Sequence, residues 1–578
     1  MHSFRGYRLI AKQESRPPRR AMHEQPSVFL RPHSSRKKRQ TYTKMSVKTK
    51  HLILASIGAV VLAPTAFTQQ NEAVITAPKA SAADCVECHE DESPGIVDHW
   101  RSSTHASQDI TCIDCHTAGP KDADGWMHEG NLIATVVTPR DCAECHEDEA
   151  DEFLHSHHAD AARILHSLDN RLAEVVEGSR IPFNPHGITP GREGFGMVNG
   201  LASAASGCWQ CHGSKVSFVG IDGSEVNVDS LRPDENGHPT NLEAVANIKK
   251  DAAGKPIFVY STWPNTGIGR KNMDGTDGAC TACHSRHDFS PRRARQPENC
   301  GKCHLGPDHP QKEIYEESKH GIAYRDMKDK LNLDSIDWIL GVDYNAAPTC
   351  ASCHMSGNKN NDGTITHDPG RRISWNNRPP VSLAMDTING KAIKEANPAK
   401  RREIIEAAGD DFDSWEAKRD RMKTACLNCH SNSYVDGFYS QYDDYIDNYN
   451  QKFATPGLKL MAALKTHKVR TGPMFDEEIE WVWFYLWHHE GRRGRHGASM
   501  MAPDYAHWHG MYEVAERFYL ELLPISLEMA DEAEHHGNKA GADAIRKMVA
   551  DIKARPEHQW VDVEKNKMKE GQKFDFDK

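Results

Sequence analysis

The sequence predicts a mainly α protein made of two unlike parts. Residues 434–469, 475–490 and 506–554 carry apolar side chains at three- and four-residue spacing with few helix breakers. No sustained alternation of apolar and polar residues, the pattern typical of strands, appears in the chain. The part before residue 433 is rich in Gly, Pro, Asp and Asn and is interrupted by pairs of cysteines. We therefore expect short helices and loops first, followed by long helices.

The composition is that of a globular protein with a mildly acidic surface. Of the 578 residues, 26% are charged and 38% hydrophobic, and the formal net charge is −11. This charge argues against nucleic acid as the natural partner and suits a basic soluble partner better.

The cysteines decide the class of protein. All sixteen fall in Cys-x-x-Cys-His motifs, and this motif is typical of covalent c-type haem attachment. The two thiols bond the porphyrin, and the adjacent histidine is the proximal iron ligand. Zinc sites and disulfides are the alternatives, but zinc sites pair cysteine clusters and do not repeat this motif singly. The eight motifs are Cys85–Cys88–His89, Cys112–Cys115–His116, Cys142–Cys145–His146, Cys208–Cys211–His212, Cys280–Cys283–His284, Cys300–Cys303–His304, Cys350–Cys353–His354 and Cys426–Cys429–His430.

A second pattern predicts distal haem ligands. The sequence aromatic-x-x-Ser-x-His-small occurs three times, each 12 to 16 residues after a motif histidine, and indicates a recurrent ligand-bearing helix. Its histidines are His105, His158 and His320. His287, three residues after a motif histidine, is a further candidate, whereas His128, His367 and His496 are weaker on spacing alone. A haem that only transfers electrons usually has both axial positions filled, and one that does chemistry needs an open position.

The N-terminal segments predict that the protein is exported from the cytoplasm. Residues 45–68 have the basic start and short apolar run of a secretory signal peptide, and that run is too short for a comfortable membrane span. Residues 1–44 are expected to be a mis-called extension of the gene start. We expect a periplasmic mature protein that begins between Gln69 and Asp84 and has no transmembrane anchor. It would comprise an octahaem domain (84–433), a helical domain (434–554) and a polar tail (555–578). The long interval between His212 and Cys280 predicts an elaborated loop region with room for a small hairpin.

Several segments resemble the octahaem hydroxylamine oxidoreductase family, over nearly the whole mature chain. They are Gly207 to Gly213, Trp263 to Arg270, Cys280 to Ser290, Pro307 to Pro310, Thr366 to Gly370 and Arg495 to Gly510. The last five motifs are also similar to the related pentahaem nitrite reductases, whose catalytic motif usually has Lys at the position of His212.

The resemblance implies a site and an assembly. In the family the fourth haem is catalytic, lacks a protein distal ligand, and is cross-linked to a tyrosine from a neighbouring subunit of a trimer; Tyr505 matches that tyrosine. Asp308 and His309 match the family's distal acid and base pair. The resemblance also makes His128, His367 and His496 distal ligands, which gives seven with the four above, as expected if one of eight haems stays open.

The function that follows is oxidation of hydroxylamine to nitric oxide or nitrite at the fourth haem. His309, with Asp308, would accept protons, and the other haems would pass electrons to a cytochrome c. Hydrazine oxidation is an open alternative. Reductive relatives lack the tyrosine, so Tyr505 argues against a reductive role. A purely electron-conducting cytochrome is a further alternative, for which His186 could supply an eighth distal ligand.

Overall fold

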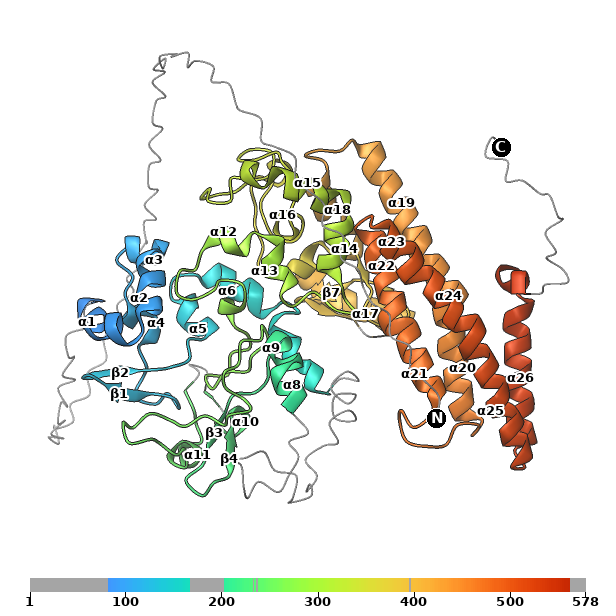
Figure 1. Cartoon of the computed structure of the whole chain (residues 1–578), viewed down its shortest axis with the longest axis horizontal. Helices are drawn as coiled ribbons and strands as arrows, with labels where there is room; N and C mark the ends of the chain where they lie inside the picture. Colours follow the sequence, from blue (N-terminus) through green and yellow to red (C-terminus); the bar gives the residue numbers. More distant parts are fainter. Residues whose placement is uncertain are drawn as a thin grey trace, which may run out of the picture. The chain divides into compact units, whose positions relative to one another are not determined.

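The computed structural model describes residues 82–166 and 202–561, apart from residues 232, 235–237, 394 and 396. These residues belong to one unit of the chain, Thr76–Lys578. Helices dominate and the strands are few and short, so the prediction of a mainly α fold is confirmed (Figure 1). The predicted extension (1–44), signal peptide (45–68) and cleavage site, His186 and most of the polar tail lie outside the described residues. In the described part, no helix combines the length and apolar character needed to cross a membrane.

Each Cys-x-x-Cys-His motif forms about one helical turn. Four motifs lie within helices, and in the other four the histidine N–H donates to the carbonyl of the first cysteine at 2.9–3.0 Å. Threonines 111, 138 and 349 begin three of these turns as capping boxes, which satisfy backbone N–H groups that the helix leaves unpaired. The helices of the first four motifs and their surroundings are α1 (Ala82–Glu92), α2 (Pro94–Arg101), α3 (Thr104–Ser107), α4 (Cys112–His116), α5 (Pro139–Ala143), α6 (Glu147–Leu154), η1 (Ala159–His166), α8 (Ala202–Ser206) and α9 (Cys208–His212).

The interval between the fourth and fifth motifs contains the expected hairpin and a small apolar core. Strands β3 (Ser217–Val219) and β4 (Glu225–Asn227) pair antiparallel, with Phe218 opposite Val226. Phe218, Val226 and the buried Leu231 belong to the core that holds this region together. Helices α10 (Val228–Leu231) and α11 (Leu242–Ala246) follow.

The rest of the haem-motif region repeats the pattern of short helices and two- or three-residue strands. The further strands are β1 (Trp126–His128), β2 (Asn131–Ile133), β5 (Trp375–Asn376), β6 (Leu383–Ala384), β7 (Thr387–Ile388), β8 (Lys391–Ala392) and β9 (Phe412–Asp413). The pairs are β1 with β2, β5 with β6, and β7 with both β8 and β9. The helices are η2 (Cys280–Ala282), α12 (Pro291–Ala294), α13 (Pro297–Gly301), α14 (Gln311–Glu317), α15 (Lys319–Met327), η3 (Lys328–Lys330), α16 (Cys350–His354), η4 (Lys359–Asn361), η5 (Pro369–Arg372), α17 (Pro398–Ala408), η6 (Gly409–Asp411) and α18 (Trp415–Cys426).

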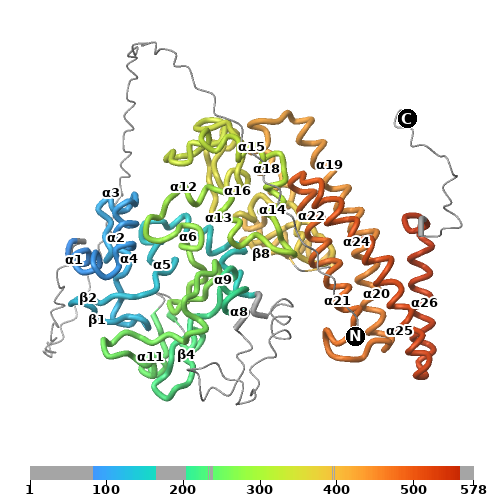
Figure 2. The backbone as a smooth tube through the Cα atoms, in the orientation of Figure 1, coloured from blue at the N-terminus to red at the C-terminus, as the bar shows by residue number. Residues whose placement is uncertain are grey.

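Long helices form the C-terminal part and pack side by side (Figure 2). Apolar residues at helical spacing, among them Phe453, Leu460 and Leu464, meet in its buried core. The first run is α19 (Asn432–Asn448), η7 (Tyr449–Ala454) and α20 (Thr455–Thr466), and the second is α21 (Glu478–Phe484), η8 (Tyr485–Glu490) and α22 (Gly491–Ser499). The third is α23 (Pro503–Ala506), η9 (His507–Tyr512), α24 (Glu513–Arg517), η10 (Phe518–Leu522) and α25 (Leu523–His535), followed by α26 (Lys539–Ala554) and η11 (Pro556–Val561).

Two helix ends differ from the sequence prediction. The helix predicted to stop at residue 490 continues to Ser499, and Gly494 within it lies against another helix, where a Cβ would come within 2.5 Å of the Tyr445 hydroxyl. The stretch predicted as helical from 506 to 554 is broken after His535. Gly537 takes a φ of 89°, and the Asn538 side chain then accepts from the Gly541 N–H at 3.1 Å to begin α26.

Candidate functional site

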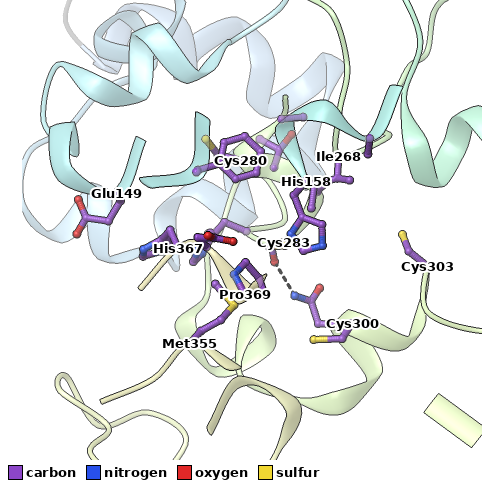
Figure 3. A pocket seen from close by; sticks show the side chains of 18 of the residues that line it. Glu149, His158, Ile268, Cys280, Cys283, Cys300, Cys303, Met355, His367 and Pro369 are labelled. Carbon is purple, nitrogen blue, oxygen red and sulfur yellow. Dashed lines mark hydrogen bonds between the residues drawn. The ribbon is translucent and has the colours of Figure 1, made fainter. Parts of the chain in front are cut away.

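One connected cavity of about 4500 Å³ joins all eight motifs. Its lining includes all sixteen cysteines and all eight motif histidines. This is several times the volume of a pocket for one small ligand, which is about 300–1,000 Å³. Figure 3 shows part of it, where His158 and His367 lie near the cysteines of the fifth and sixth motifs, Cys280, Cys283, Cys300 and Cys303. No disulfide joins any of these sixteen described cysteines, so the disulfide alternative finds no support.

Six motif histidines each face a histidine predicted as a distal ligand. The ring centroids of the six pairs lie 6.1–6.5 Å apart. The pairs are His89 with His128, His116 with His287, His146 with His105, His284 with His367, His304 with His158, and His430 with His320. A metal bonded to one imidazole on each side, at about 2 Å per bond, holds ring centres about 6 Å apart. The pairs therefore fit a haem iron between them.

The protonation of these histidines fits the same role. Burial, and then the neighbouring imidazole of His304, lowers the pKa of His158 to about 3. Burial also lowers the pKa values of His284 and His287 to about 4. These rings are therefore neutral at physiological pH, and the neutral imidazole is the form that binds a metal.

In two copies of the recurrent segment the predicted ligand lies on a helix, His105 in α3 and His320 in α15, and the chain is broken at the serine before it. This serine ends one helix and begins the next. The Ser318 hydroxyl donates to the Tyr315 carbonyl at 2.7 Å and accepts from the Gly321 N–H at 3.2 Å. Ser103 makes the equivalent bonds, and Ser156 makes a related contact with the His158 N–H at 3.2 Å. The break turns the chain, so that the histidine two residues later enters the cavity from the start of a new turn.

The residue after two of these histidines is closely packed. At Gly321 a Cβ would lie 1.9 Å from the Tyr315 carbonyl oxygen, and Ala159, which follows His158, is 1% exposed. This explains the small residue in these two copies of the sequence pattern.

Replacing His105, His158 or His320 with Ala is expected to convert one low-spin haem to high-spin, because one axial ligand is lost. Electron paramagnetic resonance would count the low-spin centres. His155→Ala is the matched control, since its side chain lies on the same segment as His158 and is 54% exposed. If the three variants keep the full low-spin count of the control, the repeat does not supply ligands.

His496, the seventh predicted distal ligand, lines the cavity, but no ring contact joins it to a motif histidine within the described residues. The motif histidine His354 also lines the cavity and faces none of the predicted distal ligands in this way. Burial, and then the charge of Arg495, lowers the pKa of His496 to about 3. The ligand role of His496, and the open position predicted at the fourth motif, stay predictions.

The fourth motif is held by the segment that follows the hairpin. The Ile268 and Gly269 N–H groups donate to the carbonyls of Cys211 and His212, at 3.0 and 3.2 Å. Gly267 lies so close that a Cβ would come within 1.9 Å of the Gly213 nitrogen, so only glycine fits there. The sequence segments that carried the family resemblance are thus in contact.

Cysteine side chains of different motifs lie next to each other. The neighbours are Cys85 and Cys112, Cys142 and Cys280, Cys300 and Cys350, and Cys211 and Cys303. The fourth motif, which contains Cys211, is therefore next to the sixth, which contains Cys303, although the fifth lies between them in the sequence. Haem groups on such neighbours would lie close together.

An acid–base cluster lies beside the fourth and sixth motifs. The Asp308 Oδ1 and His309 Nδ1 atoms are 2.5 Å apart, and His309 Nε2 lies 3.1 Å from the Cys303 carbonyl. Arg492 donates to Asp308 Oδ2 at 3.3 Å, and His488 Nε2 lies 3.9 Å from the same oxygen. We call Asp308, His309, His488 and Arg492 the distal cluster.

The cluster holds an ionised carboxylate in a buried place. Burial opposes ionisation of Asp308, but the hydrogen bond and charge of His309, together with His488 and Arg492, hold the pKa of Asp308 below its usual range. Burial likewise opposes the charge on His309, yet its contact with Asp308 raises the pKa of His309 above the usual value. Sequence reasoning missed His488 and Arg492, which reach Asp308 from a helix about 180 residues later.

Tyr505 lies outside the cavity of its own chain. It is in α23, packs against His509 with ring centroids 5.8 Å apart, and is not a lining residue. Trp508 and Tyr512 on the following turns are 55% and 51% exposed. The predicted link from Tyr505 to a haem of another chain stays a prediction.

The comparisons with known proteins support a multihaem cytochrome fold. A family model described as "Seven times multi-haem cytochrome CxxCH" matches residues 237–408. The chain is also similar in fold to a solved "Hypothetical multiheme protein", with 23% identity, a TM-score of 0.58, and coverage of 78% of this chain and 96% of that one. The chain is a mainly α multihaem cytochrome. Such c-type cytochromes are typically extracytoplasmic.

A curated relative of this cytochrome is the "Probable nitrite reductase-hydroxylamine oxidoreductase fusion protein" of Kuenenia stuttgartiensis, 26% identical over 391 residues. The match covers 63% of this chain and 35% of the relative, so the chain spans about a third of that protein's length. A solved reducing HAO-like protein complex of the same organism matches with 20% identity and a TM-score of 0.44, over 82% of this chain and 86% of that one.

Proposed function

We propose that this cytochrome carries eight haems and oxidises hydroxylamine at the fourth motif. The observation that carries the proposal is the position of the distal cluster. His309 contacts the Cys303 carbonyl, and Cys303 lies beside Cys211 of the fourth motif, so an acid–base pair lies at the edge of that haem site. The name of the Kuenenia relative combines nitrite reductase with hydroxylamine oxidoreductase, which supports chemistry on small nitrogen compounds.

Different residues of the site would bind the haem, accept protons and conduct electrons. A haem bound at Cys208, Cys211 and His212 would supply an iron for the substrate nitrogen and would take up electrons. Oxidation of hydroxylamine to nitric oxide releases three electrons and three protons. His309 is placed to accept a proton, and Asp308 and Arg492 fix its position and charge through their contacts. The six histidine pairs would hold six of the other haems, and His354 would be the proximal ligand of the seventh; together these haems would form a path to a cytochrome c acceptor.

The proposal includes a homotrimer exported to the periplasm, in which Tyr505 of one chain is cross-linked to the fourth haem of another. The position of Tyr505 outside its own cavity, beside exposed Trp508 and Tyr512, supports a contact with a second chain.

Steady-state turnover of hydroxylamine, hydrazine and nitrite, measured side by side with the gaseous products identified, tests the function. We expect hydroxylamine to be oxidised fastest, with nitric oxide or nitrite as product and reduction of an added cytochrome c. Faster conversion of hydrazine to dinitrogen would make this a hydrazine dehydrogenase. Consumption of nitrite alone would make it a reductase, and no turnover of any substrate would leave an electron-conducting cytochrome.

A further inference from the structure

A second pocket, of about 510 Å³, lies directly behind the distal cluster. Its lining includes Pro307, which precedes Asp308 in the chain, together with His489 and Glu490. The side chains of Glu513 and Glu521, which also line it, are 30% and 38% exposed, so the pocket reaches solvent.

His489 forms the wall between this pocket and the haem cavity, because it lines both. On the cavity side its ring lies 5.2 Å from the ring of His488, whose Nε2 is 3.9 Å from Asp308 Oδ2. On the pocket side the next residue, Glu490, is 4% exposed. Asp308, His488, His489 and Glu490 thus form a series of polar groups from the distal cluster to the pocket.

A π-helix creates this series. The three residues from 488 to 490 are consecutive in η8, and such turns occur frequently at functional sites. The wide turn presents His488 to the cavity, His489 to both spaces and Glu490 to the pocket. An exit from the buried site is therefore built from one stretch of backbone.

The charges around His489 are arranged in ion pairs that leave one carboxylate oxygen available. Arg517 donates to Glu490 Oε1 at 2.8 Å, and Arg493 donates to Glu513 at 2.5 Å. Glu490 Oε2 is buried and has no hydrogen-bond partner among the described residues. The charged and titratable groups that face His489 are Asp308, His488, Arg492, Arg493 and Tyr485. An unpaired buried oxygen is costly unless a water or a proton carrier meets it.

We propose that this second pocket is the proton passage of the distal cluster and that His489 connects the two. This inference rests on the proposed function, because it requires a proton-coupled reaction at the distal cluster. Each hydroxylamine that becomes nitric oxide releases three protons and three electrons. Haems held at the motifs would carry the electrons to a one-electron cytochrome acceptor, and the protons would leave from His309 and Asp308 through His488, His489 and the pocket to solvent. A reductive reaction would draw protons inward by the same route.

Two variants of His489 test the passage. His489→Phe keeps an aromatic ring against Phe484 and Tyr485 but cannot carry a proton. We expect kcat to fall about 100-fold, the lower end of the loss for a proton-transfer group, with KM and the haem spectrum unchanged and a larger solvent deuterium isotope effect. In His489→Ala the passage is opened, and added 2,6-dimethylpyridine, a weak base too hindered to bind iron, should restore much of the rate. His536→Ala, 75% exposed on the C-terminal helices, is the control.

Two results would overturn the proposed proton passage. In the first, His489→Phe has the same kcat as the control. In the second, kcat falls equally in His489→Phe and His489→Ala, and 2,6-dimethylpyridine does not restore the rate of His489→Ala. If the wild-type protein turns over none of the three nitrogen substrates, the proposed function fails. The passage is then tested separately, by measuring the rate of proton uptake during photochemical reduction of the haems. A pH indicator should then report slower uptake in His489→Phe than in the control. Equal rates would reject the passage.

Discussion

Replacing Tyr505 with Phe is expected to abolish hydroxylamine oxidation and to release covalently joined chains. If Tyr505 is cross-linked to a haem of another chain, the wild-type protein should run in hot detergent as species larger than one chain, and the variant as single chains. The change removes one hydroxyl and keeps the ring packed against His509, so stability should fall by no more than about 1.5 kcal/mol. Some reductive activity towards nitrite should remain, because the haem then resembles that of relatives without the tyrosine.

Tyr512→Phe is the matched control, because Tyr512 is an exposed tyrosine in η9, the turn that follows α23, and has no predicted link. This control should behave like the wild-type protein in denaturing electrophoresis and in hydroxylamine turnover. If the Tyr505→Phe protein oxidises hydroxylamine at the wild-type rate, the predicted cross-link is wrong. Complete dissociation of the wild-type chains in hot detergent would show the same.

Replacing His309 with Gln is expected to lower kcat for hydroxylamine by about 10²- to 10⁴-fold, the usual effect of losing a positioned proton acceptor. Gln can still hydrogen-bond Asp308 and the Cys303 carbonyl, so the haem spectra should be preserved. Steady-state kinetics under saturating hydroxylamine would measure the loss, and the absorbance spectrum would check the haems.

The chain offers a matched control for this change. His238 and Asp122 form a second histidine–carboxylate pair on the cavity lining, with Nδ1 3.0 Å from Oδ1 and side-chain exposures of 34% and 29%. The pair His309 and Asp308 has comparable exposures of 31% and 20%. His238→Gln should leave kcat within twofold of wild type, on the order expected of a surface change. Similar losses in both variants would show that His309 acts through packing alone.

The sequence predicted the fold class and four of the six facing histidines because these depend on local patterns, whereas His128 and His367 followed only from the family resemblance. Apolar spacing marks the long helices, and the aromatic-x-x-Ser-x-His repeat marks a capped turn whose histidine enters the cavity. The pairing of these histidines was not predictable, since His105 faces the third motif, His158 the sixth and His320 the eighth. These partners are brought together only by the folding of distant segments.

The same reason explains what was missed at the site. Asp308 and His309 are neighbours in the sequence, but His488 and Arg492 join them across the fold through contacts of 3.9 and 3.3 Å. The sequence prediction also misplaced helix ends, because tertiary contacts override the helix propensity of individual residues. Gly494 continues a helix because a neighbouring helix needs the space, whereas Gly537 ends one because it takes a positive φ.

The haem-to-polypeptide ratio of the purified mature protein tests the central claim most directly. All eight motifs have the same helical turn and line one cavity, so each should carry one covalently attached haem. The pyridine haemochrome absorbance, set against quantitative amino-acid analysis, should give eight haems per chain. A ratio of seven or fewer in fully matured protein would contradict the account, because at least one motif would then have another role.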